Sequence, residues 1–241
     1  MIPLRDRNPT RRTPAVTLFL VAACFAAFAL ELSVTATGGD AALEAFFRQW
    51  GAVPAEVSAA LGAGNYLGQA MIGVVTSMFL HGSWLHVLGN MLFLWIFGNN
   101  VEDRLGRAGF ALFYLAGGIA AALAQVAIDP QSEVPLVGAS GAIAAALGAY
   151  IVLFPGARIL SIVFLGFFYQ LLEVPALIVL GYWFVLQLIS GFGAFGAETA
   201  QGGVAFFAHI GGFVMGVVVG LLLRVLRAGT NRRGPAPGAM G

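Results

Sequence analysis

The chain has 241 residues, of which 59% are hydrophobic and only 10% are charged. Soluble domains carry charge on about a quarter of their residues, so this composition excludes an ordinary soluble domain and predicts a polytopic membrane protein. The formal net charge is +1, with twelve arginines and no lysine, and no nucleic-acid partner is predicted. The single cysteine, Cys24, excludes an intramolecular disulfide and a cysteine-based metal site.

The N-terminal residues 1–14 form a basic flank with four arginines against one aspartate. They precede an apolar run that predicts a first membrane span over about residues 15–34. A cleaved signal peptide is the competing interpretation. It is disfavoured because this run is longer than a usual signal core and because several more spans follow.

Residues 33–75 mix glycine and alanine with Asp40, Glu44, Arg48 and Glu56. This stretch is too polar to span a membrane and too long for a tight turn. It predicts a structured external first loop with short amphipathic helices lying at the membrane interface.

Further apolar runs predict five more spans, at about residues 82–99, 110–128, 138–155, 175–190 and 204–226. The apolar segment Ile159–Leu172, interrupted by Gly166 and Gln170, predicts a bent or interfacial piece before the fifth span. The resulting fold class is an all-α polytopic membrane protein. Its six-helix membrane domain covers residues 15–227, and a disordered cytoplasmic tail follows at 228–241.

The arginines predict the orientation of these spans. Eleven of the twelve lie in the N-terminal flank, the second-to-third turn, the fourth-to-fifth turn and the tail, and only Arg48 lies in the other loops. Because cytoplasmic loops carry the excess of basic residues, both termini are predicted to be cytoplasmic. Spans two, four and six then begin at the external face.

Ser140 opens the fourth span between glycines, in the sequence Gly138-Ala139-Ser140-Gly141. The first N–H groups of a helix have no intrahelical partner, so an oxyanion that forms near Ser140 would meet hydrogen-bond donors. The same small residues also suit close helix packing in a bilayer, and alone the motif favours that interpretation. Catalysis requires a partner from another span.

His209 begins the sixth span and His86 the second, so both are predicted to share the membrane depth of Ser140. Ser140 and His209 form a plausible pair of nucleophile and general base. Asn90 lies four residues after His86, on the same helical face, and both side chains could donate to an oxyanion together with the Ser140 N–H. No acidic residue lies at this depth in the even-numbered spans, which predicts a dyad without an orienting carboxylate.

At these residues the sequence resembles the rhomboid family of intramembrane serine proteases. The resemblance covers about residues 75–220 and joins three motifs: His81, His86 and Asn90; Gly138 to Gly141; and Ala208, His209, Gly212 and Gly216. It implies a six-helix rhomboid fold with Ser140 as nucleophile, His209 as base, and His86, Asn90 and the Ser140 N–H as the oxyanion site. His81 and the glycines support these motifs, and no cofactor or metal is implied.

The sequence departs from the family pattern at two places. Many members carry Trp-Arg in the first loop, where this chain has Ile72-Gly73, and the anchoring of that loop is therefore left open. Some members place an aromatic ring one turn after the serine to pack on the imidazole, where this chain has Ala144. The restraint on His209 is therefore unassigned by the sequence.

Three other interpretations compete. Three imidazoles could bind zinc, but no second-shell carboxylate is near. A transporter would line a path with polar residues, whereas the inner halves of these spans are almost wholly apolar. A catalytically inactive relative that binds transmembrane helices would be expected to lack the serine or the histidine, and both are present.

The resemblance implies that the partners are the lipid bilayer and transmembrane-helix substrates, which would be cleaved near their external end. The substrate itself is not encoded in any residue. The abundance of alanine, glycine and arginine without lysine is typical of a GC-rich bacterial genome, which predicts the cytoplasmic membrane of a bacterium as the location.

Overall fold

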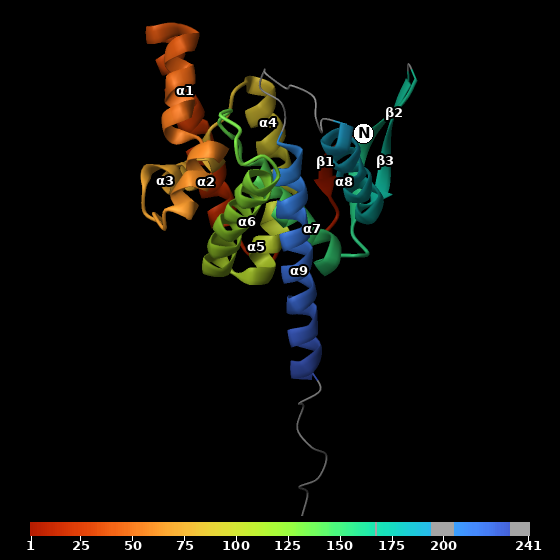
Figure 1. Ribbon diagram of the computed structural model, residues 1–241. Coiled ribbons are helices and arrows are strands. Elements are labelled where there is room, and N and C mark those ends of the chain that lie inside the picture. Colours follow the sequence, from red (N-terminus) through yellow and green to blue (C-terminus); the bar gives the residue numbers. More distant parts are fainter. Residues whose placement is uncertain (167, 194–204, 232–241) are drawn as a thin grey trace, which may run out of the picture.

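Apolar helices dominate this computed structural model, which describes residues 1–166, 168–193 and 205–231 (Figure 1). Among the described helices, three are long and apolar enough to cross a membrane: α1 (Ala15–Trp50), α6 (Arg107–Ile128) and α9 (Phe206–Asn231). The bent pair Gln69–Phe79 and Trp84–Leu105, with an angle of 79°, passes the same test only when its two parts are counted as one span. Two shorter apolar helices are α7 (Ser140–Leu153) and α8 (Ala176–Gly193). The predicted all-α rhomboid-type fold class is confirmed.

The first helix is longer than the predicted span. It runs past residue 34 to Gly39, where a φ of 70° and a ψ of −169° break it, and a second helical piece continues to Trp50. Glycine adopts this backbone conformation without the clash that a β-carbon would cause. The helical backbone therefore continues beyond residue 33, where the sequence predicts the loop to begin, because the break comes at a glycine and not where hydropathy falls.

The first loop is built from helices, as its composition predicts. After the second piece of α1 come α2 (Pro54–Gly62) and α3 (Gln69–Thr76), followed by a short 3-10 turn, η1 (Ser77–Phe79). A hydrophobic cluster fastens these helices to α6, with Ala52, Val57, Val74, Ala122 and Val126 buried in it.

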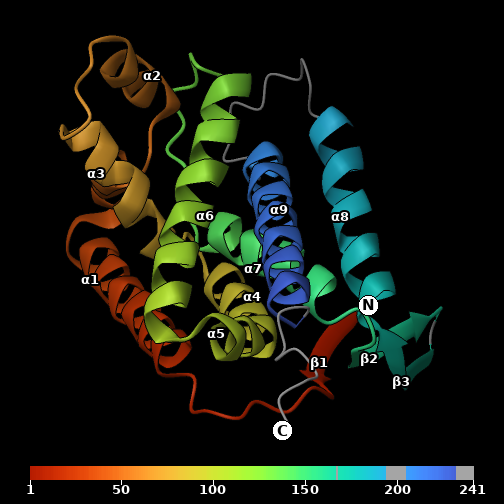
Figure 2. The same ribbon diagram turned by 90° about the horizontal axis from the view of Figure 1, so that it is seen from below.

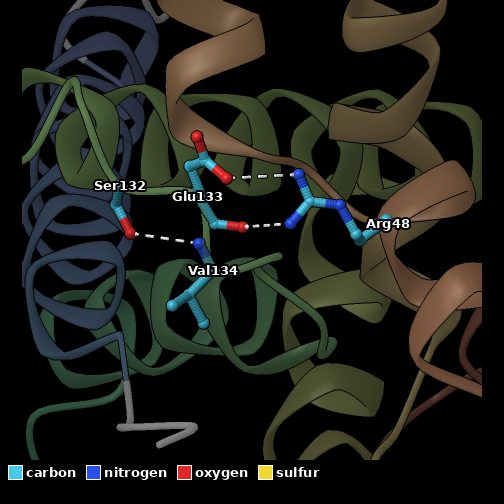
Figure 3. A network of polar contacts seen from close by, with 4 residues as sticks. All are labelled: Arg48, Ser132, Glu133 and Val134. Atoms are coloured by element: carbon cyan, nitrogen blue, oxygen red, sulfur yellow. Dashed lines mark hydrogen bonds and ion pairs between the residues drawn. The ribbon is translucent and has the colours of Figure 1, made fainter. Parts of the chain in front are cut away.

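The first loop is also tied to the segment that precedes Ser140. The Arg48 guanidinium donates to the backbone oxygen of Glu133 at 3.3 Å and pairs with its carboxylate at 3.4 Å (Figure 3). Ser132 accepts from the backbone N–H of Val134 beside them, and an antiparallel bridge joins Ala52 to Leu136. The ion pair is exposed and contributes little by itself, so the backbone bridge and the buried cluster hold this junction.

The second span consists of α4 (Trp84–Phe93), a π-helical turn η2 (Leu94–Gly98) and α5 (Asn99–Leu105). The carboxylate of Glu102 accepts hydrogen bonds from the backbone N–H groups of Val16 and Thr17 and from the Thr17 hydroxyl. Pro14, the residue before α1, makes no side-chain cap. Glu102 therefore caps α1 from another helix and satisfies N–H groups that have no intrahelical acceptor.

The serine helix α7 lies in the middle of the bundle, surrounded by α4, α6, α8 and α9 (Figure 2). Every residue from Gly141 to Tyr150 is buried. The helix has 14 residues, about 21 Å at 1.5 Å per residue, and it is shorter than the hydrocarbon core of about 30 Å. A helix that is apolar on all sides belongs inside a protein, and this one is too short to reach both membrane surfaces.

Residues 159–172, predicted as a bent or interfacial piece, form most of a β-hairpin. Strands β2 (Arg158–Leu165) and β3 (Phe168–Pro175) pair antiparallel, and β1 (Ile2–Asp6) adds a third strand from the N-terminal flank. Many residues of the hairpin are β-branched or aromatic, which favours a strand over a helix. Such a short apolar run is ambiguous by periodicity alone, and the sheet was not predicted.

The basic flank is consequently packed against the membrane domain. Asp6, at the end of β1, accepts hydrogen bonds from the Tyr150 hydroxyl at 2.9 Å and the Asn100 amide at 2.6 Å. Burial raises the pKa of the Asp6 carboxyl. Arg7 forms an ion pair with Glu173 of β3. These contacts join the N-terminal strand to the C-terminal half of α7 and to β3.

At the C-terminus, α9 continues to Asn231, so residues 228–231 of the predicted disordered tail are helical. The rest of the predicted tail, 232–241, lies outside the described residues, as does most of the predicted loop before the sixth span, 194–204.

Candidate active site

Ser140 is the first residue of α7, and the backbone before it requires glycine. Gly138 has a φ of 134° and donates its N–H to the Ser77 carbonyl at 2.9 Å. A β-carbon at Gly138 would lie 2.8 Å from His86 Nε2 and 3.5 Å from Ser140 Oγ. The absence of a side chain at this point lets the His86 ring approach the serine.

The structure brings His209 to Ser140. His209 lies in the first turn of α9, is 8% exposed, and holds its Nε2 atom 2.7 Å from Ser140 Oγ. Hydrogen bonds of this length are well formed. The serine O–H can donate to the imidazole, which is the arrangement expected of a nucleophile and its base.

This distance depends on the close contact of α7 and α9. A β-carbon at Gly212 would overlap the Gly141 carbonyl oxygen, and one at Gly216 would overlap that of Ala145. Gly148 of α7 meets the backbone of Phe213 in the same way. The predicted four-residue spacing of small side chains therefore serves close approach of the two backbones.

The second nitrogen of His209 is held by a residue that the sequence analysis missed. Gln187 of α8 places its Oε1 atom 2.7 Å from His209 Nδ1. Trp183, one turn earlier on α8, has its ring centroid 5.8 Å from that of His209. The sequence does contain a signal for this role: Gln187 is a polar residue within an apolar span, and such a residue has a functional interpretation by default.

A second glutamine supports the backbone beside the base. The Oε1 atom of Gln125, on α6, accepts the backbone N–H of Ala208 at 3.3 Å. This N–H belongs to the first turn of α9 and also donates to the Ala205 carbonyl at 3.1 Å, so its hydrogen bond is shared between the two acceptors. Gln125 was also not predicted.

His86 and His81 form an edge-to-face pair, with ring centroids 5.1 Å apart. His81 is fully buried; its Nδ1 lies 3.0 Å from the Phe79 carbonyl, and its backbone N–H donates to Glu31 of α1 at 3.0 Å. Ser83 caps α4 by accepting the His86 N–H at 3.2 Å. His81 therefore buttresses His86, and its own ring is held by the bend before α4.

Asn90 lies on α4 one turn after His86. Its Nδ2 atom is buried and finds no hydrogen-bond acceptor among the described residues. A buried amide without a partner is costly, and such a group in a native fold calls for an explanation.

A small cavity of about 40 Å³ adjoins Ser140. Its walls include Ser77, Met78, Gly138, Gly141 and Ala208. The cavity is partly open, and Ser140 at its edge is half-buried.

The zinc interpretation is disfavoured by the partners of the histidines. Both ring nitrogens of His209 are already engaged, by Ser140 and by Gln187. His81 directs Nδ1 at a backbone carbonyl. The three imidazoles do not present free nitrogens to one point, as a three-histidine site would require.

Comparison with known proteins gives a match to the Rhomboid domain family model over residues 68–225. The mitochondrial Rhomboid protein 1 of Saccharomyces cerevisiae is 33% identical over 153 residues, which are 62% of this chain and 41% of that protein. The rhomboid protease GluP of Bacillus subtilis is 31% identical over 156 residues, 65% of this chain and 27% of GluP.

A chloroplastic relative, Rhomboid-like protein 11 of Arabidopsis thaliana, is 44% identical over 69 residues, which are 29% of this chain and 24% of the relative. The aligned part of this chain therefore spans less than half the length of each of these relatives, with 41% the largest share. All three motifs that surround Ser140 lie within the matched domain.

Proposed function

Because the chain belongs to the rhomboid family, we propose that it is an intramembrane serine endopeptidase that uses Ser140 and His209 as a catalytic dyad. The observation that carries the proposal is the 2.7 Å hydrogen bond between His209 Nε2 and Ser140 Oγ, made by residues 69 positions apart in the sequence. The two groups meet at the starts of two helices, beside a small cavity.

In the proposed reaction, Ser140 Oγ attacks the carbonyl carbon of a substrate peptide bond while His209 Nε2 takes the hydroxyl proton. The imidazolium then returns this proton to the leaving amine, and an acyl-enzyme remains. Water, deprotonated by the same imidazole, hydrolyses that ester and restores the serine.

The charge on the carbonyl oxygen is stabilised by three donors: the Ser140 backbone N–H, His86 and Asn90. The Ser140 N–H lies in the first turn of α7, where helical N–H groups have no internal acceptor. His86 faces the serine across Gly138, and the Asn90 amide is buried with its donor free in the described structure. Donors aimed at developing charge are worth most in an enclosed site.

The test of the nucleophile is covalent labelling with a fluorophosphonate probe. Purified protein in detergent is expected to be labelled, and to cleave a generic transmembrane substrate, whereas Ser140→Ala should do neither. A Ser77→Ala variant is the matched control, because Ser77 lines the same cavity but donates its hydroxyl to the Val74 carbonyl. Equal labelling of wild type and Ser140→Ala would sink the assignment.

The oxyanion donors should be separable from the base by the size of their effects. Asn90→Ala is expected to lower kcat on the order of ten- to a thousandfold with little change in KM, since the hydrogen bond forms mainly in the transition state. His86→Ala should behave similarly. If both serve the same oxygen, the double variant loses less than the product of the two single effects. If Asn90→Ala lowers only thermal stability, Asn90 is a structural residue.

The alternative function is that of an inactive rhomboid relative that binds transmembrane helices without cutting them. The Ser140–His209 hydrogen bond favours the protease, because a protein that only binds has no need for it. A wild-type protein that captured a transmembrane peptide but neither cleaved it nor reacted with the probe would favour the binding function.

The proposed substrates are transmembrane helices in the lipid bilayer, cut near their external ends. The proposed location is a bacterial cytoplasmic membrane with both termini inside, in line with the arginine distribution. The relatives compared above include mitochondrial and chloroplastic proteins, so the compartment rests on the sequence composition. Reporter fusions at the two termini and in the first loop would test the orientation.

A further inference from the structure

The base of the proposed dyad is held from both sides, and its second partner is an uncharged amide. His209 Nε2 faces Ser140 Oγ at 2.7 Å, and Nδ1 faces Gln187 Oε1 at 2.7 Å. A neutral imidazole carries one proton, on one of its two nitrogens. An amide oxygen only accepts, so Gln187 places the proton on Nδ1 and leaves the Nε2 lone pair directed at the serine hydroxyl.

The same helix also restrains the plane of the ring. Trp183 and Gln187 are four residues apart on α8 and share one face. The Trp183 ring is inclined by 40° to that of His209 at a centroid distance of 5.8 Å. Ala144, where some rhomboids place an aromatic ring on the serine helix, is fully buried and has no aromatic ring to offer. The orientation of the His209 ring is therefore restrained by Trp183 and Gln187 of α8.

The depth of the site explains why an amide suits this position. A carboxylate would stabilise the imidazolium more strongly, but an ionised group at membrane depth is costly. Gln187 provides the acceptor without burying a charge. Its hydrogen bond also strengthens as the imidazole becomes charged in the transition state, because bonds to charged groups are stronger than neutral ones.

We propose that Gln187 is a positioning residue that holds the Nδ1–H tautomer of His209, in the place that an orienting carboxylate takes in a Ser-His-Asp site. The inference rests on the proposed function, since it assigns a role to the base of that reaction. Gln187 does not touch the substrate. Its loss weakens the base and leaves the nucleophile, the oxyanion donors and the fold in place.

Three variants separate the acceptor from the shape of the side chain. Gln187→Met keeps the length and removes the acceptor, and kcat is expected to fall about ten- to a hundredfold with KM unchanged, as for the loss of one hydrogen bond to a group that becomes charged. Gln187→Glu keeps the acceptor and should stay within about threefold of wild type or exceed it. Gln170→Met, on an exposed residue of β3, is the matched control and should match wild type.

A spectroscopic readout tests the tautomer directly. The chain has three histidines, so ¹⁵N-histidine labelling reports few ring nitrogens, and a His209→Ala sample identifies those of the base. Wild type is expected to show the protonated nitrogen at Nδ1, and Gln187→Met a mixture of tautomers. A purely structural glutamine would lower thermal stability in Gln187→Met and leave the tautomer unchanged.

The failure of this inference is distinguishable from that of the proposed function. If wild type neither cleaves nor reacts with the fluorophosphonate probe, the protease assignment itself is lost. If wild type is active and Gln187→Met keeps its kcat and its Nδ1–H tautomer, only the role of Gln187 is overturned. A Gln187→Glu variant that keeps the thermal stability of wild type and is as impaired as Gln187→Met would likewise overturn it, because the acceptor would not matter.

Discussion

His209→Ala is expected to reduce cleavage to background, a loss of about ten-thousandfold or more in kcat, at the upper end of what a positioned general base contributes. The imidazole is the group that lies within hydrogen-bonding distance of the Ser140 hydroxyl. Its neighbour Gln187 cannot take up the proton, because an amide has no basic site at neutral pH. The His86 ring also approaches the serine across Gly138, but among the described residues it makes no hydrogen bond to Ser140 Oγ, so it is not placed to take the proton.

The measurement is the rate of substrate cleavage together with the rate of fluorophosphonate labelling. Both should fall together, because both require a deprotonated serine. Val214→Ala is a suitable control on the same helix, since Val214 is 50% exposed and lies away from the site. The assignment of His209 as the base would be wrong if His209→Ala kept more than about a tenth of the wild-type rate, since a loss so small is below that of a general base.

The largest structural effect is expected from Gly216→Ala, a change of one methyl group. A β-carbon at Gly216 would overlap the carbonyl oxygen of Ala145, so α7 and α9 must move apart. Overpacking of this kind costs about 2 to 3 kcal/mol, which lowers the thermal midpoint by about 4 to 12 °C. Because Ser140 and His209 lie on these two helices, the same shift lengthens their hydrogen bond.

Cleavage by Gly216→Ala should therefore fall as well, by about a hundredfold, the loss that a misplacement of about 1 Å causes. The control is Gly181→Ala on α8, where no described atom lies within 4 Å of an added β-carbon. Replacing a glycine within a helix by alanine at an open position is neutral or stabilising. Equal thermal midpoints for the two variants would contradict the close packing of α7 and α9.

The membrane class, the core of the site and the order of its motifs could be predicted from the sequence. Hydropathy patterns are local in sequence, so the apolar runs and their polar interruptions can be read along the chain. Alternating arginine-rich and arginine-poor loops place the starts of three spans on one face, which is enough to bring Ser140, His209 and His86 to one depth. The four-residue spacing of Gly212 and Gly216 predicts the face on which α9 packs.

Other features depend on contacts that no local pattern records. The Ile159–Leu172 stretch belongs to a three-stranded sheet because β1, from the N-terminal flank, pairs with β2. In this pairing Ile2 lies opposite Ile162. Glu102 belongs by sequence to a charged turn beside two arginines, yet its carboxylate caps α1. In both cases the sequence indicates which backbone groups need a hydrogen-bond partner. It does not indicate which distant residue provides that partner.

The partner of His209 was decided by tertiary structure alone. The sequence places no acidic residue at this depth in the even-numbered spans but does not identify the group on Nδ1. Gln187 and Trp183 reach the ring only because α8 lies against α9. The burial of α7 was decided in the same way, since residues Gly141 to Tyr150 are all covered by the surrounding elements. Hydropathy records how apolar a segment is, and three-dimensional packing determines whether lipid or protein surrounds it.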